Sequence, residues 1–104
     1  MADDQKAVRV RIFGRVQGVW FRGWTVDQAT RLGLAGWVRN RHDGSVEALF
    51  VGAVGSVDAM LAHCCQGPPT ARVDTVEIET AQGMVGTGKY VDGTFVASES
   101  ILQR

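Results

Sequence analysis

Features that mark membrane-spanning, secreted and disulfide-bonded proteins are missing from this sequence of 104 residues. It contains no apolar run long enough to cross a membrane, so no membrane span is expected. The first six residues include two aspartates and no apolar stretch, which excludes a secretory signal and makes the cytoplasm the expected location. Cys64 and Cys65 are adjacent, and a disulfide between neighbours would be strained, so both are expected as reduced thiols.

The sequence also lacks net charge. Its 11 basic and 11 acidic residues cancel, so no bulk electrostatic affinity for nucleic acid or membranes is expected. The charges are nevertheless uneven, because residues 5–45 contain eight of the basic residues and only Asp27 and Asp43 as acids. An anion-binding site is therefore expected in the first half of the chain.

Candidate nucleophiles and metal ligands are few. Neither His42 nor His63 has a partner at metal-ligand spacing, so no metal and no other cofactor is expected. Neither cysteine precedes an arginine at the spacing of a cysteine-phosphatase loop. Residues 83–90 nearly match a P-loop, but Tyr90 stands where that motif needs a hydroxyl for Mg²⁺, so a plain connection is expected.

Length and composition predict one globular domain spanning residues 1–104, with residues 1–6 as a frayed polar tail. The hydrophobic pattern predicts the order β-α-β-β-α-β. Alternating strands expose one face, and two helices cover the other. We therefore expect an α+β fold: a ferredoxin-like split β-α-β sandwich, with an antiparallel sheet of four to five strands and two helices on one face. The expected strands centre on residues 8–12, 37–38, 46–50, 76–78 and 90–97, the helices run from Phe21 or Arg22 to Leu32 and from a Ser56 cap to Gly67, and residues 52–55 form a loop.

The segment Gly14–Arg22 has the composition of an anion-binding loop before a helix. Gly14 and Gly18 permit positive φ angles, which let several backbone amides point at one centre. The first helical turn offers Arg22 and no acid, and a cation at this positive helix end is unfavourable unless an anion binds there. Spacing alone leaves two interpretations equally open: a phosphoryl site, or a glycine loop whose arginine points into solvent.

Three blocks of the sequence resemble the acylphosphatase family. Residues 14–22 match its signature loop G-x-V-Q-G-V-x-F-R, residues 32–40 match a second block that is followed by the turn at 43–47, and residues 67–73 resemble a weaker landmark. The resemblance covers about residues 8–78 and implies the same ferredoxin-like fold. The family usually has a basic residue where this chain has Ser98, so no contact from that end of the chain to the loop is carried over.

The resemblance implies hydrolysis of the carboxyl–phosphate bond in small acyl phosphates, giving a carboxylate and inorganic phosphate. It implies that Arg22 and Asn40 are catalytic, with Arg22 binding the phosphoryl group and Asn40 placing the attacking water. Because an acyl phosphate has a good leaving group, its hydrolysis mainly needs positioning and charge stabilisation, which requires no metal. Without the loop, Asn40 would be interpreted as a turn former. The implied phosphate-binding set, acting through backbone amides, is Gln17, Gly18, Val19, Trp20, Phe21 and Arg22.

Two other functions remain as alternatives. An acylphosphatase-like module could hold phosphate or carbamoyl phosphate without turnover. Single-stranded RNA could bind the open sheet face, but Arg9 and Arg11 have no aromatic residue between them, which disfavours this alternative. We expect a monomer that acts on small molecules, with no nucleic-acid or membrane partner.

Overall fold

The computed structural model describes residues 4–81 and, as backbone only, residues 95–97. The predicted order of strands and helices is confirmed within these residues. The predictions for the glycine-rich connection, for the start of the last strand and for Ser98 lie outside them. Neither described helix is long and apolar enough to cross a bilayer. The elements are β1 (Gln5–Arg15), α1 (Phe21–Arg31), β2 (Ala35–Asn40), β3 (Val46–Ala53), α2 (Val54–Gln66), β4 (Arg72–Thr80) and β5 (Phe95–Ala97).

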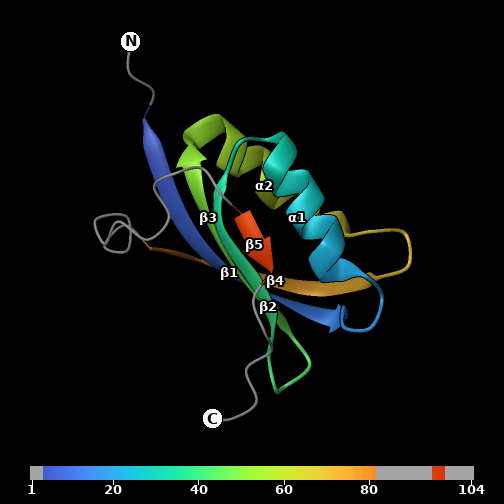
Figure 1. The fold of residues 1–104 in the computed structure, drawn as a ribbon. Coiled ribbons are helices and arrows are strands. Elements are labelled where there is room, and N and C mark those ends of the chain that lie inside the picture. The colour runs from blue at the N-terminus through green and yellow to red at the C-terminus, as the bar shows by residue number, and fades with distance from the viewer. Residues whose placement is uncertain (1–3, 82–94, 98–104) are drawn as a thin grey trace.

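The strands form one sheet in the order β4-β1-β3-β2-β5 (Figure 1). The first four are joined by antiparallel pairings, β1 with β3, β1 with β4 and β2 with β3, which confirms the expected antiparallel sheet. β5 differs from that expectation because it pairs with β2 in parallel. The whole arrangement is the expected ferredoxin-like sandwich, with α1 and α2 packed on the same core-forming face of the sheet.

Both faces of the sheet carry buried apolar side chains. On the helix face, Val10 and Ile12 of β1 pack with Phe21 of α1 and Met60 of α2. The opposite face was expected to be solvated, but it carries a second buried cluster that includes Trp37. Strict alternation in the sequence identifies only the first of these cores. The second consists of Ala7, Ala35, Trp37, Leu49, Val51 and Ala81.

Two predicted boundaries are wrong, for one shared reason. β3 runs to Ala53 and α2 begins at Val54, so there is no loop at residues 52–55, and Ser56 lies inside the first helical turn. The chain around Gln5, expected in the frayed tail, belongs to β1 and pairs with the end of β3. The Val54 N–H donates to the carbonyl of Asp4 (3.1 Å), so backbone pairing between β1 and β3 continues up to the helix.

Candidate active site

Sheet topology brings three distant segments to one end of the molecule. β1 and β2 are both antiparallel to β3, so they run in the same direction and their carboxyl ends lie at the same edge. The loop at residues 16–20 follows β1, and Asn40 ends β2. β4 runs opposite to β1, and its first residue, Arg72, pairs with Arg15 at this same edge. Residues 68–70, which precede β4, therefore approach the loop as well.

The end of β1 and the loop that follows it have an unusual backbone at three positions. Gly14 (φ 134°) lies at an irregularity in the pairing of β1 with β4, and a Cβ at this position would collide with the carbonyl oxygen of Arg72. Gly18 also has a positive φ (76°). Trp20, which caps α1, has a φ of 68° and is the one non-glycine residue with a positive φ in the described part of the chain. Such strained residues concentrate at functional sites.

The Trp20 side chain lies over the start of α1. Its indole rests against Gly23, where a Cβ would collide with the indole nitrogen. The Trp20 carbonyl accepts the first helical hydrogen bond from the Trp24 N–H (3.0 Å). Although it is held in this way, Trp20 remains 62% exposed, which is unusual for a large apolar residue. Because Gly23 has no side chain, the Trp20 indole can pack beside the N-terminus of α1.

A small pocket of about 160 Å³ lies between this helix end and β2. It brings the first-turn residue Arg22 together with Asn40, the pair that the resemblance implies. Among the residues that the structure describes, no carboxylate lines the pocket. Arg22 and the positive end of α1 give it positive charge, an arrangement that favours an anion. The lining consists of Val16, Gly18, Trp20, Phe21, Arg22, Gly23 and Asn40.

Gln17 and Val19 belong to the loop but do not line this pocket. The Gln17 side chain turns toward the β2–β3 hairpin, where its Nε2 donates to the carbonyl of Arg41 (2.7 Å) and to that of Ser45 (2.8 Å). Val19 packs against the core, and its carbonyl accepts a hydrogen bond from Thr70 Oγ1 (2.8 Å). Any contact of these two residues with a ligand in the pocket must therefore come from the backbone.

A wider groove of about 610 Å³ adjoins the pocket and shares Gly18 and Trp20 with it. Its far wall is Pro68, Pro69 and Thr70. The site analysis of the sequence did not include this wall, although the third matched block (residues 67–73) contains it.

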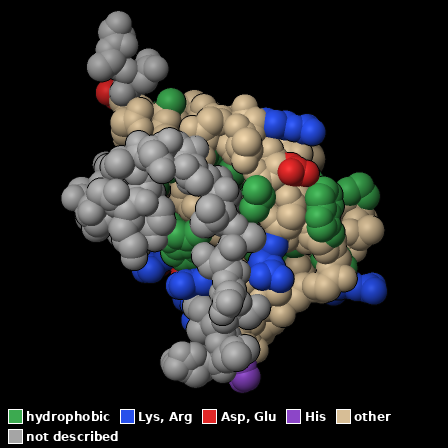
Figure 2. Space-filling model, in the orientation of Figure 1, with side chains coloured by type: hydrophobic (Ala, Val, Ile, Leu, Met, Phe, Trp, Pro, Cys, Tyr) green, Lys and Arg blue, Asp and Glu red, His purple; other side chains and the backbone are tan. Residues whose placement is uncertain are grey.

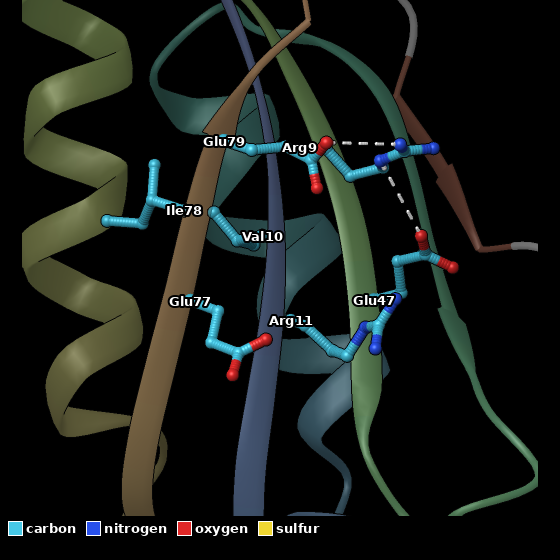
Figure 3. Close-up of a pocket in the computed structure, with 7 residues that line it drawn as sticks. All are labelled: Arg9, Val10, Arg11, Glu47, Glu77, Ile78 and Glu79. Carbon is cyan, nitrogen blue, oxygen red and sulfur yellow. Dashed lines mark hydrogen bonds and ion pairs between the residues drawn. The ribbon is translucent and has the colours of Figure 1, made fainter.

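On the face of the sheet opposite the pocket, ion pairs join the end of β2 to the start of β3. Arg39 and Arg41, the neighbours of Asn40, both pair with Glu47 Oε1, at 3.0 and 2.8 Å. Arg9 approaches the other Glu47 oxygen at 3.8 Å, and it also pairs with Glu79 (Figure 3). The Glu47 side chain is only 4% exposed. Burial raises its pKa, but hydrogen bonds from Arg41 and Arg39 outweigh burial and lower the pKa below its ordinary value.

Glu47 was not among the candidate residues identified in the sequence. The signal was present in the pattern. Arg9, Glu47 and Arg39 all alternate outward from the same face of adjacent strands, and the hairpin register places Arg39 opposite Glu47.

The chain is similar to known proteins in both sequence and structure. The family model for acylphosphatase matches residues 8–90. The chain belongs to the acylphosphatase family. It is 53% identical over 85 residues to an acylphosphatase of Rhizorhabdus wittichii, covering 82% of this chain and 86% of that one. It is also 63% identical over 73 residues to an acylphosphatase of Rhodospirillum rubrum, covering 70% of this chain and 80% of that one. The structure of an acylphosphatase from Coxiella burnetii matches with a TM-score of 0.80 at 30% identity, covering 91% of this chain and 94% of that one.

Membership of the acylphosphatase family confirms the predicted family, fold and enzyme class, a hydrolase that acts on acid anhydrides. It implies an acyl phosphate as substrate and phosphate as product.

The competing sites found in the sequence have ordinary explanations in this acylphosphatase-family structure. Cys64 is buried and Cys65 is exposed, both as free cysteines. Burial raises the pKa of Cys64 to about 12, so this thiol stays protonated and unreactive. Among residues 4–81 and 95–97, no three His, Cys, Asp or Glu residues are grouped to hold a metal. The P-loop-like segment lies outside these residues.

The open sheet face gives little support to RNA binding by this acylphosphatase-family chain. Trp37, an aromatic residue of this face, is only 6% exposed, and the Arg39 guanidinium lies over its ring at 4.2 Å. The hollow beside β4 in Figure 3 is lined by Arg9 and Arg11 together with Glu47, Glu77 and Glu79. On the face shown in Figure 2, the basic side chains that can be seen lie at separate places. Proteins that bind single-stranded RNA instead use exposed aromatic side chains, on which bases stack, and positively charged grooves.

Proposed function

We propose that this chain hydrolyses the carboxyl–phosphate bond of small acyl phosphates without a metal ion. The observation that carries the proposal is the pocket where Arg22 and Asn40 meet at the N-terminus of α1, with no carboxylate among its described lining residues. From the sequence alone, residues 14–22 could be either a phosphoryl site or a glycine loop whose arginine points into solvent. A pocket that joins the arginine to an amide from another strand favours the phosphoryl site.

The phosphoryl group binds first, at the helix end. Arg22 supplies a guanidinium, which can grip two phosphoryl oxygens at once. Backbone amides of residues 17–22 donate to the oxygens, and the dipole of α1 adds a favourable field. The loop backbone is shaped by the positive φ angles of Gly18 and Trp20, so its amides can stabilise the charge of the transition state with little reorganisation.

Asn40 places the attacking water. A side-chain amide can accept one hydrogen bond from water and donate another, so it orients the water without removing a proton. The water oxygen bonds to phosphorus, and the bond from phosphorus to the carboxylate oxygen breaks with its electron pair leaving on the carboxylate. Both water hydrogens remain with inorganic phosphate, so the step needs neither a general acid nor a covalent enzyme intermediate.

We further infer a monomer that acts in the cytoplasm on dissolved small molecules, with no nucleic-acid or membrane partner and no cofactor. Zero formal charge supports the absence of polyanion partners. The adjacent Cys64 and Cys65, between which a disulfide would be strained, are compatible with a reducing compartment.

Titration with inorganic phosphate separates the two assigned roles. Arg22→Ala should lose both turnover and phosphate binding, because it removes the charge that holds the anion. Asn40→Ala should lose turnover but keep phosphate binding, because the loop and Arg22 are untouched. Calorimetric titration of both variants with phosphate, beside the native protein, measures this.

The reverse result would overturn the residue assignment, namely retained phosphate binding in Arg22→Ala and lost binding in Asn40→Ala. Phosphate binding by a native protein that turns over no acyl phosphate would instead favour a binding module.

A further inference from the structure

The phosphoryl site and Asn40 come from different elements, so the distance between them depends on contacts between those elements. The phosphoryl site lies in the β1–α1 loop and the first turn of α1. Asn40 lies at the end of β2, in the hairpin with β3. Backbone pairing within the sheet fixes β2 against β3, but it does not fix the loop against the hairpin.

The side chain of Gln17 joins these two parts. Its Nε2 carries two hydrogens and donates to two carbonyls, that of Arg41 at 2.7 Å and that of Ser45 at 2.8 Å. Arg41 directly follows Asn40, and Ser45 directly precedes Val46, the residue that pairs with Asn40 across the hairpin. The Gln17 amide therefore grips the hairpin on both strands, one residue beyond the Asn40–Val46 pair.

We propose that Gln17 is a positioning residue, whose side chain sets the placement of Asn40 relative to the phosphoryl group. This inference rests on the proposed function, because it assigns the geometry of the water that Asn40 orients. Without the two hydrogen bonds the hairpin is free to shift against the loop. A shift of about 1 Å at a reacting centre can lower a rate by about 100-fold.

Phosphate binding should survive the loss of this side chain. The loop is shaped by the positive φ angles of Gly18 and Trp20, and by the hydrogen bond from Thr70 to the Val19 carbonyl. None of these involves the Gln17 side chain. The hairpin itself should also stay folded, because Glu47 binds Arg39 and Arg41 from the opposite face.

The test is Gln17→Met, which matches the length of glutamine and removes both donors. We measure kcat and KM for benzoyl phosphate, and the constant for competitive inhibition by inorganic phosphate. We expect kcat to fall by about 10- to 100-fold while the inhibition constant stays within about twofold. Loss of general structure would not split kcat from phosphate binding in this way.

Two further variants sharpen the result. Thr70→Val removes one side-chain hydrogen bond to the same loop without reaching the hairpin, so it should weaken phosphate inhibition more than it lowers kcat. Gln17→Asn keeps an amide but is one methylene shorter, so it should lose kcat as Gln17→Met does. It also replaces Gln17→Met if that variant does not fold, as judged by circular dichroism.

A kcat within about twofold of native in a folded Gln17 variant would overturn the inference. An equal loss of kcat and of phosphate affinity would also overturn it, because Gln17 would then act on the phosphate loop. Failure of the proposed function is distinct from both results, because it would be seen in the native enzyme as absent turnover.

Discussion

Gly14 is the residue at which the pairing of β1 with β4 becomes irregular, just before the loop at residues 16–20. Its φ of 134° is one that L-residues rarely adopt, and its Cα faces the backbone of β4 at Arg72. The close approach is backbone against backbone, so no flexible side chain can yield to an added atom. Gly14 therefore allows the loop to start where β4 also begins.

Gly14→Ala should lower the free energy of unfolding by at least about 1–3 kcal/mol, through backbone strain and the collision with the Arg72 carbonyl. Denaturant unfolding measures this. Gly55→Ala is the matched control, because Gly55 lies in the first turn of α2 with open space around it. It should be neutral or stabilising by up to about 1 kcal/mol. Equal stability changes in the two variants would contradict the role given to Gly14.

At the residue scale, sequence reasoning predicted which side chains meet better than how each one points. Arg22 and Asn40 could be paired because both lie in blocks that resemble one family. Gln17 lies in the same block, yet the orientation of its side chain toward Arg41 and Ser45 depends on the packed hairpin. A motif identifies positions, and it carries no information on where a flexible amide finds its partners.

The β2–β3 hairpin is the element that presents Asn40, and charge on its outer face holds it. Glu47 is nearly buried and accepts from Arg39 and Arg41, with Arg9 nearby. Removing one member of such a cluster is costly because the remaining charges are left without compensation. Three arginines would then face a neutral partner.

Glu47→Gln should lower the free energy of unfolding at neutral pH by up to about 3 kcal/mol. The folded-state pKa of Glu47 lies below its unfolded value, so its contribution is present above the unfolded pKa and is lost as pH falls through the folded pKa. The native protein should therefore lose stability below about pH 4.5, and the variant should lose less over the same interval.

Denaturant unfolding at several pH values measures this difference. Asp43→Asn is a useful comparison, because hydrogen bonds from Ser45 lower the pKa of this exposed turn residue in the same direction. A Glu47→Gln variant with the native pH dependence would contradict the account of the hairpin.

Element boundaries show where local sequence stops being sufficient. The helix start at Phe21 and the helix-ending Gly33 (φ 72°) follow from local chemistry, and both agree with the sequence analysis. The junction between β3 and α2 does not follow, because it depends on the backbone bond from Val54 to Asp4. Gly52 resembles a loop residue in sequence, yet it lies in β3 against Leu34, where a larger residue would collide.

At the scale of the whole molecule, topology explains why one end of the sheet carries the site. The order β4-β1-β3-β2 makes β1 and β2 run in the same direction, so the loop and Asn40 lie at the same end of the sheet. The alternating pattern and the number of helices were enough to predict this fold. The second buried cluster and the parallel pairing of β5 were not predictable, because both depend on contacts between segments distant in sequence.

The central claim is that a pocket built around Arg22 hydrolyses acyl phosphates without a metal. The most direct test is the rate of benzoyl phosphate hydrolysis near neutral pH, with a chelator present, for the native protein and Arg22→Ala. We expect rapid native turnover that the chelator does not change and that Arg22→Ala abolishes while its circular dichroism stays native. Native turnover that disappears with the chelator, or that survives in Arg22→Ala, would contradict the claim.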